Sequence, residues 1–584
     1  MLISLREGGA TNLIKKLKNM RSKGSENVPS FIDGKSGNDN IANHFASKYA
    51  KLYNTHNSSD ETLKIIESLN INNDDFYEIE YVTPEIVYQA IMCINLNSND
   101  VNFGFKSNAI KIAADILHKH LTVLFQAFLI HGYVPKDLIS CSLKPIIKDK
   151  MGDRFSSDNY RAIGSSSLFL KILDWVIFIL FEDKLKPAEL QFGFQKKNST
   201  TMCSWTVIET INYFNNRNSP VFACFVDLTK AFDLVDFAKL FGKLKYKIGK
   251  TFIRLLAFIY VFQSCHVNWA GIKSDSFKVS NGIRQGAVLS PTLFSIYIND
   301  LFELLSCSGF GCYINNMFYG LVGYADDLVL LSPDLQGLQI LFNKTKTFLE
   351  NLGLKISINV ENPEKSKTKC MVFVTKKNPT SFVHLNDFNI PWCDSYKHLG
   401  HIFYKNGTLS HDADYKKRAF VGSFFELKQE LKSQNLLVFM NLIKVYLSHF
   451  YGSNLWNLFN IDYVYVAWNK IMRIVFNLPY CTHRYLLEPF SGVTHLQTML
   501  TNRFLKFYET LYLSEKQVIS NLRLVQENDC RSTFGLNVRN ICLKNNCNNI
   551  GECKKNAIKY CPIDDNEIWR VDFLKELIAL KNHQ

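Results

Sequence analysis

The chain has 584 residues, 47% hydrophobic and 21% charged, which is long enough for several domains and too apolar for a largely disordered protein. Its net charge of +14 favours a polyanionic partner such as nucleic acid without requiring one. The 15 cysteines form no regular framework, so we expect reduced thiols in an intracellular protein, in the nucleus or cytoplasm. The longest apolar stretch, residues 168–181, is shorter than the roughly 20 residues of a membrane-spanning helix, so we expect no membrane.

The predicted elements begin with a polar segment that becomes helical near residue 84, where Thr83 followed by Pro84 is typical of a helix start. Residues 143–163 predict a strand, a loop and a second strand, and residues 168–181 predict a buried helix. From 220 to 405, short strand-like runs alternate with helical segments, which indicates an α+β fold.

The remainder of the chain is predicted to be mostly helical and basic up to about residue 515. Residues 415–510 hold 11 lysines and arginines against 5 acidic residues. From 516 onward the sequence is polar and ends in a cluster of cysteines.

Three aspartates stand where apolar runs end. The run Val221–Val226 predicts a buried strand with Asp227 at its end, and GYADDLVLLS predicts a hairpin with Asp326 and Asp327 at its turn. Acids brought together beside apolar strands need a counter-charge, which a divalent cation such as Mg²⁺ supplies. An Asp-Asp pair alone is more typical of an ordinary polar hairpin turn. Its setting, about a hundred residues after the first strand, favours the metal.

A glycine-containing loop, GIRQGAVLSP, lies between the two acidic segments. Gly282 and Gly286 lack a Cβ and would allow close approach of a base pair or sugar. Arg284 and Gln285 can hydrogen-bond to a phosphate and a base edge. The alternative is an ordinary loop that leads into a helix with Pro291 in its first turn.

These segments, in this order, resemble the reverse transcriptases of non-LTR retrotransposons, the jockey-like and related long interspersed elements. The resemblance rests on FVDLTKAFDLVD, GIRQGAVLSPTLFSIYINDL and GYADDLVLL. It extends from NVPSFIDGKSGNDNIANHFASKYAKLYN through SDNYRAIGSSSLFLKILD, LQFGFQKKNSTTMCSW, SKTKCMVF and YKHLGHIF to HRYLLEPFSGVTHLQTML.

The resemblance implies a right-hand polymerase of α+β type, with an antiparallel palm sheet backed by helices. Its implied divisions are an N-terminal extension over 1–127, fingers and palm over 128–404, a helical thumb over 405–515 and a C-terminal tail over 516–584. The implied activity is RNA-directed DNA synthesis on an RNA template, from a DNA primer or nicked target DNA and dNTPs. The implied cofactor is a pair of Mg²⁺ ions, with Mn²⁺ as the alternative ion.

Site roles follow from the same resemblance. The catalytic, metal-binding residues are Asp227, Asp326 and Asp327. The nucleotide-binding residues are Lys148, Arg161, Phe232, Gln285 and Lys367. The template–primer residues are Arg284, Gly286, Tyr396 and Gly400, to which we add Lys416, Lys417 and Arg418 as the densest basic cluster directly after the Tyr396–Gly400 segment. Without the resemblance, Phe232 is as readily a core residue, Lys148 and Arg161 are surface charges, and the basic helices are a solvated face.

Two alternative functions remain open. One is a decayed, non-catalytic nucleic-acid-binding remnant of a transposon, and the other is an intron-maturase-type splicing partner. No segment resembles an endonuclease, so that activity would have to come from elsewhere. The spacing of Cys542, Cys547, Cys553 and Cys561 disfavours a zinc site.

Overall fold

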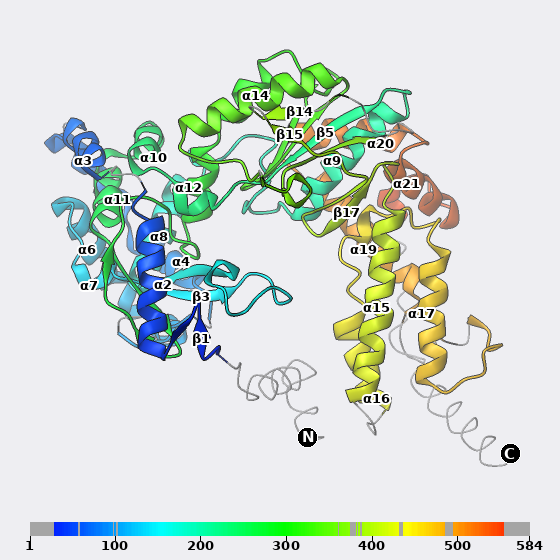
Figure 1. The fold of residues 1–584 in the computed structure, drawn as a ribbon, viewed down its shortest axis with the longest axis horizontal. Helices are drawn as coiled ribbons and strands as arrows, with labels where there is room; N and C mark the ends of the chain where they lie inside the picture. Colours follow the sequence, from blue (N-terminus) through cyan, green and yellow to red (C-terminus); the bar gives the residue numbers. More distant parts are fainter. Residues whose placement is uncertain are drawn as a thin grey trace.

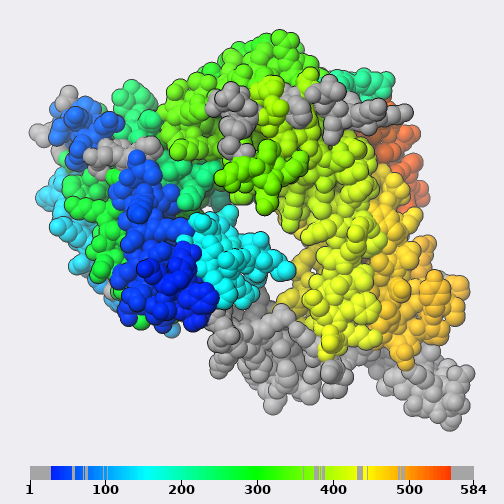
Figure 2. Space-filling model, in the orientation of Figure 1, coloured from blue at the N-terminus to red at the C-terminus, as the bar shows by residue number. Residues whose placement is uncertain are grey.

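A computed structural model describes most of the chain between residues 28 and 553. The described ranges are 28–55, 59–69, 71–96, 98–100, 103–359, 361–373, 381, 383–385, 388–430, 436–484, 487 and 494–553. Figure 1 shows three groups of elements arranged as an open arch, with the N-terminal elements at one end and long helices at the other. Figure 2 shows the hollow that the arch encloses.

The N-terminal group is mainly helical, and its described helices begin at Asn38 rather than near residue 84, so that part of the prediction is wrong. Thr83 caps helix α4 by accepting a hydrogen bond from the Ile86 amide, and Pro84 occupies its first turn, as the sequence predicts. The elements of this group are β1 (Phe31–Ile32), β2 (Lys35–Ser36), α2 (Asn38–Leu52), α3 (Ser59–Ser68), η1 (Asn73–Tyr81), α4 (Pro84–Cys93), α5 (Ser107–Ile112), α6 (Ala114–His131) and α7 (Lys136–Ile139).

The first sheet lies beside this group. Strand β3 pairs antiparallel with β4 and parallel with β6, so segments more than 100 residues apart in the chain share one sheet. The predicted buried helix over 168–181 is confirmed as α8. The elements are β3 (Cys141–Ile147), η2 (Ser157–Asn159), β4 (Tyr160–Ser165), α8 (Leu168–Phe181), α10 (Phe237–Leu244), α11 (Lys250–Phe262), β6 (Ser264–Trp269), β7 (Ile272–Lys273) and β8 (Phe277–Lys278).

The central sheet is fully antiparallel, in the order β11-β12-β5-β13. Nearly every residue of β5, β12 and β13 is buried, because helices α9 and α14 pack against the sheet. The predicted strand over 221–226 and the predicted hairpin over 323–332 are both confirmed. The elements are α9 (Thr200–Asn215), β5 (Val221–Val226), η3 (Ala231–Leu234), α12 (Ser290–Tyr297), α13 (Asp300–Ser306), β9 (Tyr313–Ile314), β10 (Met317–Phe318), β11 (Leu321–Tyr324), β12 (Asp327–Ser332), α14 (Leu335–Asn351), η4 (Pro363–Lys365) and β13 (Lys369–Phe373).

The last group begins with two short hairpins and is then helical, as predicted up to about residue 515. Its elements are β14 (Val383–Leu385), β15 (Phe388–Ile390), β16 (Ser395–His398), β17 (His401–Tyr404), α15 (Ser410–Glu430), α16 (Leu436–Leu442), η5 (Ile443–Leu447), η6 (Ser453–Leu455), α17 (Asp462–Val475), α19 (Leu496–Tyr512), α20 (Gln517–Asn528) and α21 (Thr533–Lys544).

Helices α20 and α21 return to the central sheet. They pack on α9, and Asn216 beside that helix bonds to Asp529. The segment that the sequence analysis treats as a tail therefore includes two helices that share the core of the molecule. Among the described residues, no helix combines the length and apolar character needed to cross a membrane.

Candidate active site

The three predicted aspartates meet at one end of the central sheet. Asp227 directly follows β5, and the register that pairs Leu328 with Val226 places Asp327 opposite it. Asp326 lies in the two-residue turn between β11 and β12. All three line a cavity of about 600 Å³ on the inner side of the arch.

Burial and the repulsion of neighbouring carboxylates disfavour the charged forms of Asp326 and Asp327. Burial raises the pKa of Asp327 to about 7, and the charges of Asp326 and Asp227 add to the rise. Burial also raises the pKa of Asp326. The Lys367 ammonium, 3.6 Å from Asp227 Oδ2, and the Arg161 guanidinium offset part of this repulsion. The site would therefore gain from further positive charge.

The donor chemistry fits a divalent cation bound together with its substrate. No three acidic, histidine or cysteine side chains in the described ranges converge closely enough to hold an ion by themselves. Mg²⁺, however, is usually held by one or two carboxylates, with waters and substrate phosphates completing its shell. The three carboxylates that line the cavity can supply the protein ligands of such an ion.

The same cavity also carries positive charge. Lys148 and Arg161 line the cavity, and the Lys148 ammonium donates a 2.8 Å hydrogen bond to the Asp158 carbonyl. Burial lowers the pKa of Lys148, and the neighbouring charges of Lys230 and Arg161 lower it further. A cluster of cations that repel one another favours binding of a polyanion.

Two lysines that line the cavity were missed by the sequence analysis. Lys48 of α2 lines the cavity and bonds to Ser157 Oγ at 2.5 Å and Asp158 Oδ1 at 2.6 Å. Lys230 lines it too, with a left-handed backbone (φ 50°) just before η3. Lys48 belongs to the N-terminal polar segment, and its partners lie more than 100 residues away, so no local pattern marks it.

Phe232 and Gln285 also line the cavity. The Phe232 ring stacks on that of Phe294 with centroids 4.6 Å apart, and it is partly exposed rather than a core residue. Gln285 Nε2 donates a 2.8 Å hydrogen bond to Asp233 Oδ1. Gly286 also lines the cavity, with a φ of 109°, and a Cβ there would lie 2.8 Å from the Gly164 carbonyl oxygen. The close approach at Gly286 is therefore to strand β4 of the same chain.

Arg284 requires a correction. The sequence analysis expects it on the template–primer, but it is buried, with its guanidinium 5.5 Å from the Tyr260 ring centroid. Burial raises the pKa of Asp174 to about 6, and the Arg284 charge limits that rise. Arg284 therefore balances an interior carboxylate and does not line the cavity.

Tyr396 and Gly400 belong to the β16–β17 hairpin beside the acids. The Tyr396 ring stacks on Phe225 at 4.5 Å, and its hydroxyl donates a 2.8 Å hydrogen bond to the Lys367 carbonyl. Gly400 has a φ of 79°, and a Cβ there would lie 2.9 Å from the Tyr451 ring. The hairpin thus packs against both the central sheet and the segment before η6.

The basic cluster on α15 is mostly neutralised within the chain. Lys416, with its side chain 12% exposed, bonds at 2.7 Å to Asp412, whose carboxylate is fully buried. Lys417 and Arg418 both pair with Asp414. Only Arg418, with its side chain 77% exposed, is broadly open to solvent. Lys416, expected to contact the template–primer, is therefore largely taken up by a buried carboxylate of its own helix.

The described tail cysteines are reduced. The sulfurs of Cys542 and Cys553 lie 3.9 Å apart, and Cys547 is a neighbour of both. Cys561 lies outside the described residues.

Comparison with known proteins relates part of the sequence to a described family. The family described as reverse transcriptase (RNA-dependent DNA polymerase) matches residues 147–403. The chain is 24% identical to the RNA-directed DNA polymerase from mobile element jockey of Drosophila melanogaster, over 80% of this chain and 52% of that protein. It is 26% identical to the Pol polyprotein from a type-2 retrotransposable element of the same species, over 43% of this chain and 24% of that protein.

The chain thus spans about half, or less, of the length of these curated relatives. A solved structure of apo telomerase from Candida tropicalis aligns with a TM-score of 0.32 at 13% identity, covering 53% of this chain and 62% of that one. That similarity is too low to support an argument.

Proposed function

We propose that this chain, whose residues 147–403 form a reverse transcriptase region related to those of jockey and other non-LTR retrotransposons, is an RNA-directed DNA polymerase. It would extend a DNA primer on an RNA template by adding dNTPs. One observation carries the proposal: three carboxylates and a group of cations line one cavity of about 600 Å³. That arrangement suits a nucleoside triphosphate held with divalent metal.

The cations would hold the triphosphate. Lys148, Arg161 and Lys230 line the cavity, and charge-assisted hydrogen bonds from such cations to phosphate oxygens are strong. Burial lowers the pKa of Lys148, the charges of Lys230 and Arg161 lower it further, and a bound polyanion would relieve that repulsion. Lys367, whose ammonium lies 3.6 Å from Asp227 Oδ2, would donate a proton to the leaving pyrophosphate.

The acids would hold the metal. Asp227, Asp326 and Asp327 would bind two Mg²⁺ ions, which when bound activate the primer 3′-hydroxyl and stabilise the leaving pyrophosphate. The chain itself fixes these acids rigidly, since β5 and β12 are interior strands of the sheet and the turn between β11 and β12 spans only two residues.

Phe232 would select the sugar. Its stack on the buried Phe294 holds the ring in one position beneath the cavity. A ribose 2′-hydroxyl over that ring would collide with it, whereas a deoxyribose would not.

The three groups of the arch would be fingers, palm and thumb of a right-hand polymerase. The first sheet supplies the triphosphate cations, the central sheet the acids, and α15 to α19 the thumb that tracks the template–primer. The divisions 128–404 and 405–515 follow this assignment. Residues 28–55 would then belong to the fingers, because Lys48 lines the same cavity.

Primer extension with purified protein tests the proposal. We expect incorporation of dNTPs on an RNA template with Mg²⁺, and none with a chelator or with Asp326→Asn. Binding of template–primer without any extension by the unmodified chain would overturn the polymerase assignment and favour a non-catalytic remnant.

A further inference from the structure

The turn that carries Asp326 is in contact with a short segment, Ala188–Gly193, which we call the strap. Gln191 within it is fully buried. Its Oε1 accepts hydrogen bonds from the Ala325 amide at 2.8 Å and the Gly193 amide at 3.0 Å. Its Nε2 lies 3.3 Å from the Ala325 carbonyl, to which it donates. One side chain thus satisfies both backbone polar groups of Ala325.

The strap also pairs with the sheet. The Phe192 amide donates to the Gly323 carbonyl at 2.8 Å, and the Gly323 amide donates to the Leu190 carbonyl at 2.9 Å. A Cβ at Gly193 would lie 2.4 Å from the Ala325 nitrogen, so the approach needs glycine. The strap is therefore an additional edge of the central sheet, in direct contact with the turn.

The turn needs this support because its conformation is unfavourable by itself. Ala325 has a φ of 56°, a left-handed backbone that a residue with a Cβ rarely adopts. Such strain persists only where surrounding contacts enforce it, and Gln191 makes those contacts.

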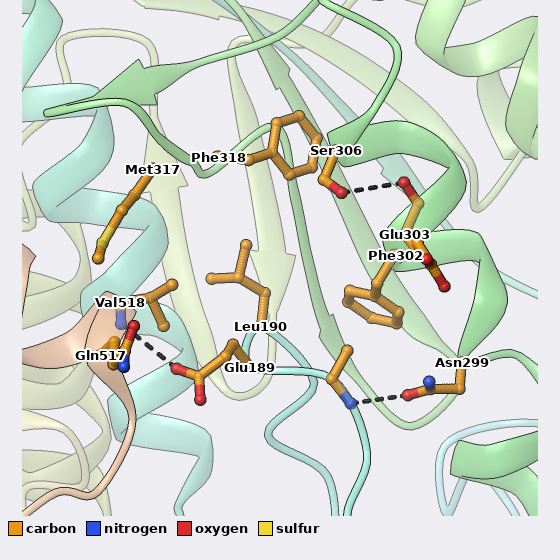
Figure 3. Close-up of a pocket in the computed structure, with 11 residues that line it drawn as sticks. Glu189, Leu190, Asn299, Phe302, Glu303, Ser306, Met317, Phe318, Gln517 and Val518 are labelled. Carbon is orange, nitrogen blue, oxygen red and sulfur yellow. Dashed lines mark hydrogen bonds between the residues drawn. The ribbon is translucent and has the colours of Figure 1, made fainter.

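Lys516, from the segment just before α20, fixes the strap in turn. Its ammonium donates to the carbonyls of Glu189 at 2.8 Å, Gln191 at 3.2 Å and Ala188 at 3.4 Å. It also lies 5.2 Å from the centroid of the Phe192 ring. The first turn of helix α20 adds a contact, since the Val518 amide donates to Glu189 Oε2 at 3.3 Å (Figure 3).

Packing alone does not hold the outer side of the strap. A cavity of about 330 Å³ lies there, between the strap, α13, the β9–β10 hairpin and the start of α20. Leu190 lies among the residues that surround it (Figure 3). Because a cavity provides few van der Waals contacts, hydrogen bonds restrain this side of the strap: those of Lys516, and one from the Ala188 amide to Asn299 Oδ1 at 2.7 Å.

We propose that Lys516 and Gln191 are positioning residues for the catalytic turn, so that the C-terminal helices are a working part of the polymerase. The chain of contacts runs from the Lys516 ammonium to the strap carbonyls, through the Gln191 side chain, to the backbone of Ala325 beside Asp326. This inference rests on the proposed function. It adds that the region beyond residue 515 affects the rate of the chemical step, because its contacts with the strap position the turn that carries Asp326.

The alternative is that Lys516 merely docks α20 onto the sheet. Asn521 on the same helix provides a matched control, because its amide donates to the Ile314 carbonyl and the Tyr319 hydroxyl, both at 3.1 Å and outside the strap. A docking role predicts equal effects of Lys516→Met and Asn521→Ala. The positioning role predicts a larger effect of Lys516→Met, and of Gln191→Met, on the turn.

Two measurements on the full chain test this. In single-nucleotide primer extension, we expect Lys516→Met and Gln191→Met to lower kcat at least about tenfold with little change in KM for dNTP, since a small misplacement of reacting groups is costly. Lys516→Arg, which keeps a cation with several donors, should recover most of the rate. Asn521→Ala should stay near the unmodified chain.

Hydrogen exchange supplies a readout that does not need activity. The Ala325 amide should exchange faster in Lys516→Met than in Asn521→Ala, with thermal unfolding confirming that both variants are folded. Equal exchange and equal kcat in these two variants would overturn the inference while the unmodified chain still extends primers. If Lys516→Met does not fold, unchanged exchange at Ala325 in Gln191→Met would overturn it. An inactive unmodified chain would instead contradict the proposed function.

Discussion

The Tyr53 hydroxyl donates a 2.9 Å hydrogen bond to Oδ1 of Asp233, the same atom that accepts from Gln285. Tyr53 directly follows helix α2, in the segment that the sequence analysis separates from the polymerase. A Cβ at Gly282 would lie 2.6 Å from the Asp233 carbonyl oxygen and 2.8 Å from the Tyr53 ring, so the three residues are tightly packed. The N-terminal segment thus helps to fix Gln285, which lines the cavity.

Tyr53→Phe should therefore weaken nucleotide binding more than it slows the chemical step. Loss of the hydroxyl leaves the buried Asp233 carboxyl with one donor fewer, at a cost of about 1–3 kcal/mol. We expect a raised KM for dNTP with a smaller change in kcat. Tyr49→Phe is the control, because Tyr49 lies on α2 and lines the same cavity, but its hydroxyl has no hydrogen-bond partner among the described residues. Equal KM values for the two variants would contradict the role of Tyr53.

Asp326→Asn should abolish extension without destabilising the protein. The substitution removes one of three carboxylates that repel one another, so the melting temperature should stay equal or rise. Loss of a metal ligand should lower kcat/KM at least about a hundredfold. Asp300→Asn, in an exposed ion pair with Lys243, should leave extension unchanged. Near-normal polymerisation by Asp326→Asn would refute the metal assignment.

Phe232→Ala should admit ribonucleotides. Truncation removes the ring proposed to block a 2′-hydroxyl, so discrimination between dNTP and rNTP, measured as the ratio of kcat/KM, should decrease. Phe194→Ala provides the control, because this exposed ring lines the same cavity but packs near Tyr324 instead. Retained rejection of rNTPs by a folded Phe232→Ala variant would leave Phe232 with only a packing role.

The basic residues of α15 should differ in their effects. Lys416→Met leaves the fully buried Asp412 carboxylate without its cation and should destabilise the protein by about 3–5 kcal/mol, measured by denaturant unfolding. Arg418→Gln should have little effect on stability. If Arg418 contacts a phosphate, the salt dependence of template–primer affinity should flatten by about one unit. An unchanged slope would identify Arg418 as a solvated charge.

Glu209 should make stability pH-dependent. Burial in α9 raises its pKa from 4.5 to about 8. Between these values the folded chain retains a proton that the unfolded chain has released, so the free energy of unfolding falls as pH rises. Glu209→Gln should remove this pH dependence. Its free energy of unfolding, relative to that of the unmodified chain, should therefore increase from pH 5 to pH 8. Exposed Glu303→Gln should show no such growth. A parallel pH dependence in both variants would contradict the prediction.

The sequence predicts those features that depend on neighbouring residues. The apolar run before Asp227 and the hairpin around Asp326 are visible as local patterns, and so is the helix start at Pro84. The partners of buried polar groups are not, because they come from distant segments. Tyr53 and Asp233 are 180 residues apart, and Lys516 reaches a carbonyl 325 residues away. Lys416 is the exception, since its partner Asp412 is four residues away on the same helix.

The order of strands in the central sheet has a consequence for synthesis of the chain. Strand β5 lies between β12 and β13, yet both partners follow it by about a hundred residues or more. At roughly 5–20 residues per second, a ribosome would leave this apolar strand with two bare edges for about 5–20 s. Meanwhile the strands of the first sheet are completed on either side of it in the chain. Nascent β5 is therefore the segment most in need of protection from other chains, by a chaperone or by the helices already made.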